Sequence, residues 1–208
     1  MSLFERGLCP RNPWGEVSEG GRKPPSEEMR LYDDLEAVLL DEEAIQGEVR
    51  RLGERISKDY ADRQPHLIGV LKGSVVFLAD LIRALTVPLT VDFIWMSPYG
   101  TPTPSGVVRI RKDLDDPIEG RDVIVVEGII DTGLTLSYLL RNFRTRNPAS
   151  LKVCAFVNKR AQRIIDLGVD YVGREIPDKF VVGYGLDYRQ RYRNLPVLGV
   201  LKPSALDQ

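Results

Sequence analysis

The sequence predicts an α/β protein with a mostly parallel, twisted sheet, helices on both faces of that sheet, and a small C-terminal hood. Two observations predict this fold. From about residue 41 to residue 167, short apolar runs alternate with stretches of helical periodicity, the pattern of chains that build a parallel sheet from β–α units. From residue 171 to residue 201 the pattern changes to short β-like pieces. With 208 residues, of which 43% are hydrophobic, the chain can bury one substantial core.

The first predicted element is an amphipathic helix that starts after Asp41. Apolar residues recur there in steps of four and three, with charged residues between them, so one face of the helix is suited to packing on a sheet. Asp41 and Glu43 are helix-capping residues at its start. The apolar positions are Ile45, Val49, Leu52, Ile56 and Tyr60.

The β–α alternation continues from this helix to residue 167. The first elements are a strand at 66–71, a helix at 74–85, a strand at 89–96, a loop at 97–106 that is long enough to move, and a strand at 107–111. The next are a strand at 123–130, a helix at 134–143, a strand at 151–157 and a short helix at 162–167. His66 and Trp95 lie on apolar strands and are interpreted as structural residues.

The chain is expected to form one domain at 41–208, which includes the hood, preceded by a partly flexible N-terminal extension at 1–40. No apolar run approaches the length of a membrane span or a secretory signal. The formal net charge of −1 gives no reason to expect nucleic acid or a membrane as a partner. Only Cys9 and Cys154 are present, so we expect no disulfide framework and a cytoplasmic location.

Residues 123–135 combine an apolar strand, the acidic residue Glu127 and a hydroxyl-rich turn that opens a helix. The turn at 132–135 supplies backbone N–H groups and hydroxyls where the helix begins, which is a suitable cradle for a phosphate. Because ligands of parallel sheets bind beyond the carboxyl ends of the strands, we expect Lys72, Asp131 and Lys159 at the same site as Glu127.

This segment resembles the phosphoribosyl-pyrophosphate signature of type I phosphoribosyltransferases, an apolar strand followed by two acids, two aliphatic residues and Asp-Thr-Gly-x-Thr. Glu127 matches the first acid, whereas Gly128 stands in place of the second. From about residue 41 to residue 201 the chain is most similar to hypoxanthine-guanine phosphoribosyltransferases. The resemblance implies a dimer or tetramer. It also implies that the missing acid weakens sugar handling by roughly ten- to a hundred-fold, so that Gly128→Asp lowers the KM for phosphoribosyl pyrophosphate.

The resemblance also assigns the residues that hold phosphoribosyl pyrophosphate. Lys72-Gly73 matches a pyrophosphate loop with a cis peptide bond next to the lysine, and Ser97 and Tyr99 match a mobile loop, although Pro98 replaces the usual serine. Arg193 matches a pyrophosphate-binding arginine. The complete set implied is Lys72, Gly73, Ser97, Tyr99, Glu127, Asp131, Thr132, Gly133, Leu134, Thr135 and Arg193.

For the base, the resemblance implies that Lys159 donates to the six-position oxygen of a purine, that Phe180 stacks on the ring, and that Val181 contacts its edge through the backbone. An ammonium can only donate hydrogen bonds, so Lys159 favours a 6-oxopurine over adenine. Asp131 is the implied catalytic proton acceptor. Asp187 is implied to lie at the purine site and, with Glu127, to hold Mg²⁺.

The reading that explains most residues is a magnesium-dependent purine salvage transferase that moves the phosphoribosyl group from phosphoribosyl pyrophosphate to hypoxanthine or guanine. The alternative is a nucleotide-binding regulatory protein of the same fold with weak or no catalysis, which Gly128 and Pro98 motivate. A third possibility is an enzyme that acts on a pyrimidine or on xanthine. The sequence does not rank hypoxanthine, guanine and xanthine.

Overall fold

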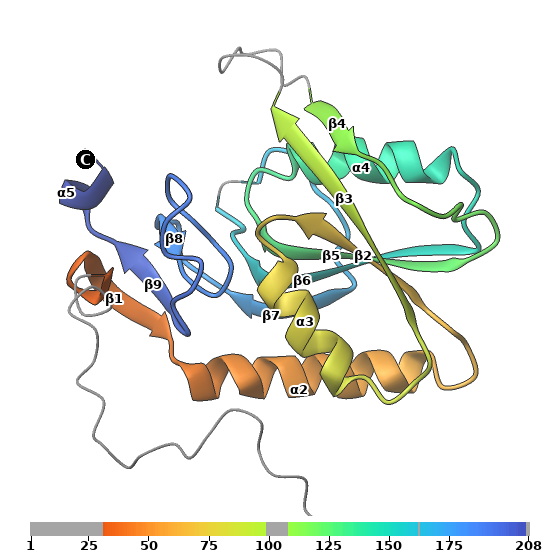
Figure 1. Cartoon of the computed structure of the whole chain (residues 1–208), viewed down its shortest axis with the longest axis horizontal. Helices are drawn as coiled ribbons and strands as arrows, with labels where there is room; N and C mark the ends of the chain where they lie inside the picture. The colour runs from red at the N-terminus through yellow and green to blue at the C-terminus, as the bar shows by residue number, and fades with distance from the viewer. Residues whose placement is uncertain (1–30, 99–107, 162, 207–208) are drawn as a thin grey trace, which may run out of the picture.

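The computed structural model describes residues 31–98, 108–161 and 163–206. Its main sheet has six strands in the order β4-β3-β2-β5-β6-β7, and all neighbours are parallel except β3 and β4 (Figure 1). The strands are β2 (His66–Leu71), β3 (Thr90–Pro98), β4 (Val108–Lys112), β5 (Asp122–Ile130), β6 (Ser150–Asn158) and β7 (Tyr171–Glu175). The predicted α/β fold with a mostly parallel sheet is confirmed.

The long helix α2 (Glu42–Asp59) forms where the sequence predicts it. Asp41 is its N-cap: the side chain accepts a hydrogen bond from the backbone N–H of Ala44 at 2.9 Å, an interaction that contributes about 1 kcal/mol in typical proteins. The predicted apolar stripe is buried, with Ile45 and Leu52 at 1% and 0% exposure. Local capping and periodicity were therefore sufficient to predict this helix.

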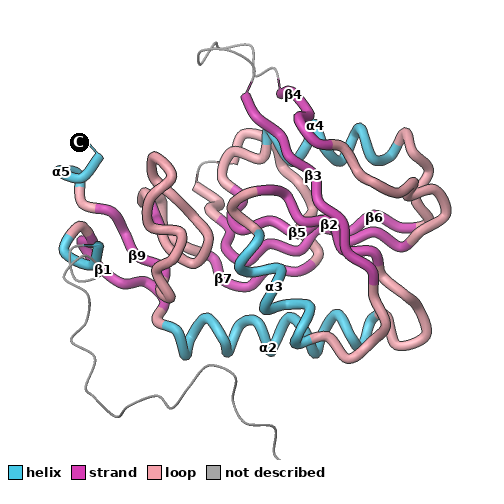
Figure 2. Tube along the Cα trace, viewed as in Figure 1, coloured by secondary structure: helices cyan, strands magenta, loops and turns pink. Residues whose placement is uncertain are grey.

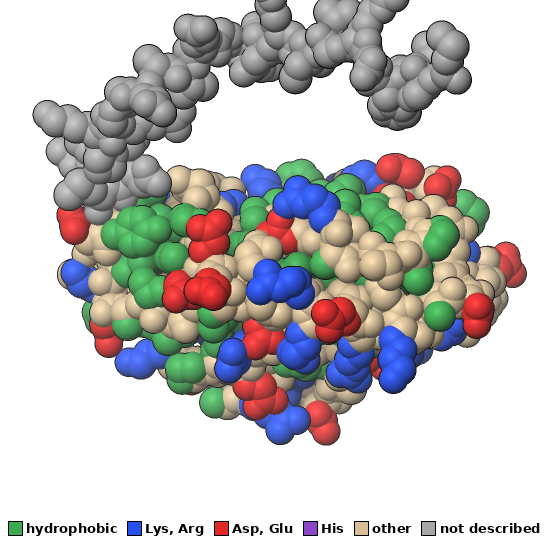
Figure 3. Space-filling model, turned by 90° about the horizontal axis from the view of Figure 1, so that it is seen from below, with side chains coloured by type: hydrophobic (Ala, Val, Ile, Leu, Met, Phe, Trp, Pro, Cys, Tyr) green, Lys and Arg blue, Asp and Glu red, His purple; other side chains and the backbone are tan. Residues whose placement is uncertain are grey.

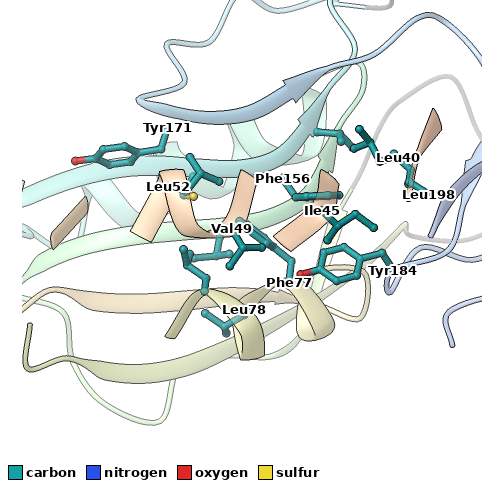
Figure 4. Close-up of a cluster of buried hydrophobic side chains, with 14 of the residues drawn as sticks. Leu40, Ile45, Val49, Leu52, Phe77, Leu78, Phe156, Tyr171, Tyr184 and Leu198 are labelled. Atoms are coloured by element: carbon teal, nitrogen blue, oxygen red, sulfur yellow. The ribbon is translucent and has the colours of Figure 1, made fainter. Parts of the chain in front are cut away.

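Helices cover both faces of the main sheet. α2 and α3 (Val75–Ala84) pack on one face, and Figure 4 shows Ile45, Val49 and Leu52 of α2 in one cluster with Phe77 and Phe156. α4 (Leu134–Arg144) packs on the opposite face, where its apolar side forms a second core with β2, β5 and β6. Burying one large apolar side chain contributes about 1.5–3 kcal/mol, so the two cores hold the sheet between its helices.

On the outside of α2, acidic and basic side chains are interspersed rather than separated into regions of one sign (Figure 3). None of the helices in the described ranges combines the length and the apolar character that crossing a bilayer requires.

The hood is a second, three-stranded antiparallel sheet with the order β1-β9-β8. It contains β1 (Leu35–Leu40), β8 (Val181–Val182) and β9 (Leu198–Leu201), followed by α5 (Pro203–Leu206). Figure 2 shows these elements at one end of the molecule, with a long loop between β8 and β9. The predicted hood is confirmed, but its first strand lies before residue 41, inside the segment that was expected to be an extension. β1 could not be recognised locally because its partner, β9, lies far away in the sequence.

Two further expectations were wrong. Residues 163–167 form no helix, because Ile164 and Ile165 donate their backbone N–H groups to the carbonyl of Thr132, at 3.0 and 3.3 Å, instead of to a helical ladder. The segment that begins at Tyr171 starts with β7, which pairs in parallel with β6 and so belongs to the main sheet rather than to the hood.

His66 and Trp95, both interpreted as structural, differ in their surroundings. His66 is 1% exposed, and its Nδ1 lies 2.8 Å from the hydroxyl of Thr90. Trp95 is 36% exposed, so the expectation of a core residue was wrong. The ring of Trp95 is covered by the cations of Lys72 and Arg111, which lie 5.9 and 5.4 Å from its centroid.

Candidate active site

A cavity of about 310 Å³ lies between the carboxyl edge of the main sheet and the hood. Three of its lining residues follow parallel strands directly: Lys72 after β2, Asp131 after β5 and Lys159 after β6. The chain folds this way because parallel neighbours end at the same edge of a sheet. From the segment that contains β8 and the loop after it, the hood contributes Phe180, Val181, Asp187 and Arg193.

Lys159 and Asp131 form an ion pair in this cavity. The Nζ atom of Lys159 lies 3.4 Å from Oδ2 of Asp131, and the backbone N–H of Lys159 donates to the carbonyl of Ile130 at 2.9 Å. Lys159 is only 6% exposed, whereas the side chain of Asp131 is 48% exposed. A cation that donates only and a carboxylate that accepts only are thus held side by side, with the carboxylate open to a ligand.

On the hood side, Phe180 and Val181 face different surroundings. Phe180 is 43% exposed, which is unusual for a large aromatic side chain, and Tyr188 packs edge-on against its ring with centroids 5.5 Å apart. Val181 is 6% exposed and starts β8. The edge-on contact holds the Phe180 ring and leaves aromatic surface available for stacking.

The cavity is also lined by two basic residues, Lys72 after β2 and Arg193 from the hood. The Leu71–Lys72 peptide bond is cis, as the resemblance implied. Arg193 donates to the carbonyl of Gly185 at 2.7 Å and pairs with Asp187 at 2.6 Å. Gln190, which the sequence reasoning missed, accepts from Lys72 at 3.1 Å and from Arg193 at 3.4 Å. The two cations predicted to bind pyrophosphate therefore share one acceptor.

The phosphate turn follows Asp131 and opens α4. Gly133 is the N-cap of α4 in the left-handed conformation, with φ of 81°, and as a glycine it has no side chain to cap the helix. The first turn of α4 contains no acidic residue. The helix N-terminus thus carries the partial positive charge and the backbone N–H groups that suit an anion, and the N–H of Leu134 donates to the hydroxyl of Thr132 at 3.4 Å. Thr132, Leu134 and Thr135 lie in this turn but not in the lining of the cavity itself.

Glu127 also lies outside the lining of the cavity. Burial raises the pKa of its carboxyl group to about 8. Among the described residues, no three His, Cys, Asp or Glu side chains form a ready-made metal site. Mg²⁺ is commonly held by one or two carboxylates together with substrate phosphates. Asp187 offers a donor of that type, and Glu127 would offer one after losing the proton that its raised pKa retains at neutral pH.

Two predicted site residues lie at the edge of the described residues, and two lining residues were not predicted. Tyr99 lies outside the described residues, and Ser97 is described only through its backbone, which pairs with Arg109 of β4. Gly73 lines the cavity, as predicted. Ile129 and Leu186 also line it, although they were not predicted, because apolar residues next to motif residues resemble ordinary core positions in a sequence.

Comparisons with known proteins agree with this geometry. The family model described as phosphoribosyl transferase domain matches residues 37–189. Hypoxanthine-guanine phosphoribosyltransferases of Bacillus subtilis and Mycobacterium avium are 51% and 47% identical, over 85% and 88% of this chain and 99% and 95% of theirs. A crystal structure of a hypoxanthine phosphoribosyltransferase from Staphylococcus aureus matches with a TM-score of 0.82 and 43% identity, over 85% of this chain and 96% of that chain. The chain therefore belongs to the phosphoribosyltransferase family, among the hypoxanthine-guanine phosphoribosyltransferases.

Proposed function

We propose that this protein transfers the 5-phosphoribosyl group from phosphoribosyl pyrophosphate to hypoxanthine or guanine and releases pyrophosphate, a purine salvage reaction. The observation that carries the proposal is the buried Lys159 paired with the exposed Asp131 at 3.4 Å, in one cavity with Phe180, Lys72 and Arg193. This set combines a donor for a carbonyl, a proton acceptor, a stacking surface and two cations for a leaving group.

At the base end, Lys159 donates to the six-position oxygen of the purine, and Phe180 stacks on the ring. The ammonium has no lone pair, so it rejects the exocyclic amine of adenine, which needs an acceptor at the same position. Val181 lies beside Phe180 and offers backbone groups to the purine edge. Together these contacts orient the ring nitrogen toward the sugar.

At the phosphate end, the N–H groups of the turn at 132–135 bind the 5′-phosphate, and Lys72 and Arg193 bind the pyrophosphate. Asp187 and Glu127, together with substrate oxygens, would hold Mg²⁺, which when bound would supply further positive charge to the departing pyrophosphate. When pyrophosphate binds, Lys72 and Arg193 exchange their shared acceptor, Gln190, for phosphate oxygens. The pairing of Arg193 with Asp187, which also lines the cavity, holds the guanidinium there before substrate arrives.

The transfer itself passes through an oxocarbenium-like sugar, as in glycoside chemistry. Asp131 accepts the proton that the purine ring nitrogen loses as it bonds to the anomeric carbon. A positioned proton acceptor typically accelerates a reaction by about 10²- to 10⁴-fold. The predicted mobile loop carries Tyr99 and would begin after Ser97, which is part of β3. Its closure excludes water, which would otherwise hydrolyse the activated sugar.

The test is a screen of hypoxanthine, guanine, xanthine, adenine and a pyrimidine with phosphoribosyl pyrophosphate and Mg²⁺, in which nucleotide products are measured. We expect products from hypoxanthine and guanine, and a fall in kcat of at least about 100-fold in Asp131→Asn. Nucleotide binding without product would favour the regulatory alternative. Product from a pyrimidine alone, or from xanthine alone, would favour the third possibility, an enzyme that acts on one of those bases. Nothing in the comparisons favours the regulatory alternative, because the relatives named above carry enzyme names.

A homodimer or homotetramer and a cytoplasmic location remain part of the proposal. Size-exclusion chromatography with light scattering measures the assembly directly. A monomer at micromolar concentration contradicts that part of the proposal without affecting the proposed reaction.

A further inference from the structure

Gly128, the departure from the two-acid signature, lies against the backbone of the predicted pyrophosphate loop. A Cβ atom added to Gly128 would lie 2.6 Å from the carbonyl oxygen of Gly73 and 3.0 Å from its carbonyl carbon. The same atom would lie 3.1 Å from a methyl group of Leu186. Real Cβ atoms essentially never approach other atoms within 3.0 Å, so a side chain at position 128 requires the backbone at Gly73 to move.

A second glycine, from the hood, reaches the same carbonyl. A Cβ atom added to Gly185 would lie 2.7 Å from the oxygen of Gly73, and Gly185 has a φ of 93°, which side chains rarely adopt. One carbonyl of the loop is thus enclosed between two positions without side chains, Gly128 in β5 and Gly185 in the loop after β8. We call Gly128 and Gly185 the glycine slot.

We propose that Gly128 is a positioning residue: its missing side chain lets the glycine slot enclose the carbonyl of Gly73, and this fixes the loop that presents Lys72 to pyrophosphate. This inference rests on the proposed function. It reverses the expectation drawn from the sequence that Gly128→Asp improves the handling of phosphoribosyl pyrophosphate. An acid at position 128 must first displace the carbonyl of Gly73, and Lys72 is attached directly to that residue.

The size of the effect follows from the displacement. A movement of roughly 1 Å brings the carbonyl back to ordinary contact with an added Cβ, and misplacement by this distance can lower activity by about 100-fold. The effect should be selective, because Phe180 and Val181, at the base end, are not among the atoms nearest to Gly128. The KM for phosphoribosyl pyrophosphate should therefore rise while the KM for the base does not.

The experiment compares the full-length wild type with Gly128→Ala and Gly128→Asp. In both variants we expect the KM for phosphoribosyl pyrophosphate to rise at least ten-fold, and the KM for hypoxanthine to stay within three-fold of wild type. KM does not depend on the fraction of molecules that fold, so the KM of a destabilised variant still describes its folded molecules. Gly47→Ala is the matched control, because an added Cβ meets nothing within 4 Å at that position of α2.

Three kinetic outcomes overturn the proposal: unchanged constants, a lower KM for phosphoribosyl pyrophosphate in Gly128→Asp, or a parallel rise of both KM values. If neither variant yields folded protein, hydrogen exchange of the wild type decides. The glycine slot predicts that the amides of Lys72 and Gly73 exchange slowly before pyrophosphate is added, and slow exchange that appears only with pyrophosphate overturns it. The amide of Ser74 is the internal reference, because it donates to the carbonyl of Val70 at 3.4 Å. The exchange measurement needs no turnover, so its result is independent of whether the proposed reaction is correct.

Discussion

Replacing Lys159 by Gln tests the chemistry of base selection most directly. The lysine is 6% exposed and pairs with Asp131 at 3.4 Å, so its ammonium acts in a largely dry part of the cavity. A hydrogen bond to a charged group contributes about 1.5–3 kcal/mol, which corresponds to roughly a 10- to 150-fold change. Lys159→Gln should therefore lower kcat/KM for hypoxanthine by roughly that factor.

The substitution should also change selectivity. A Gln amide can donate or accept, so it can pair with the exocyclic amine of adenine, whereas an ammonium cannot. The ratio of kcat/KM for hypoxanthine to that for adenine should fall by more than the activity toward hypoxanthine alone. Steady-state rates with each base at saturating phosphoribosyl pyrophosphate measure both quantities.

Lys152→Gln is the matched control for this prediction. Lys152 lies on the same strand, β6, but does not line the cavity, and its Nζ contacts the hydroxyl of Tyr171 at 3.2 Å. This variant should keep both the activity and the base preference. The reasoning is refuted if Lys159→Gln retains kcat/KM for hypoxanthine within three-fold, or if its activity falls without any change in the preference over adenine.

Three further predictions concern the stacking residue, acid stability and the core. Phe180→Ala should raise the KM for hypoxanthine by roughly 5- to 150-fold, because stacking of a base on an aromatic ring contributes about 1–3 kcal/mol; an equal rise for phosphoribosyl pyrophosphate would contradict a base-specific role. Asp92 is 5% exposed, and although burial acts to raise its pKa, the backbone N–H groups of Phe93 and Asp115 hold the pKa below its ordinary value of 3.8. The folded state thus favours the charged form, so Asp92 stabilises the protein above about pH 4 and loses this contribution as the pH falls further. Melting temperatures between pH 3 and 7 should show a gap between wild type and Asp92→Asn that narrows toward low pH, and a gap independent of pH would refute the linkage. Phe156→Ala should lower the free energy of unfolding in urea by about 3–5 kcal/mol, because Phe156 is 1% exposed; a loss below 1 kcal/mol would mean that this core is not closely packed.

The sequence was sufficient wherever the determining contacts are local. Asp41 and the apolar stripe of α2 lie within a few turns of one helix, so capping and periodicity predicted its bounds closely. The apolar strand before Asp131 and the turn after it are equally local, and they predicted where β5 ends and α4 begins. The motif order also predicted that Lys72 and Lys159 would reach one cavity, because each follows a parallel strand.

Local pattern failed where a distant partner decides the structure. The segment at 163–167 has helical periodicity, but its N–H groups bond to the carbonyl of Thr132 instead. β1 exists because β9 pairs with it. Gly128 looked like a lost acid, and only the folded chain places the carbonyl of Gly73 where a side chain at position 128 would begin.

The sequence by itself therefore determined the fold class, the family and the chemical type of most site residues, because these depend on periodicity, capping and the order of motifs along the chain. The tertiary structure alone decided the pairing of Lys159 with Asp131, the acceptor that Lys72 and Arg193 share, and the glycine slot. Each of these joins residues far apart in the sequence, and the distance between such residues is set by how the sheet, the helices and the hood pack together rather than by any local preference of the chain.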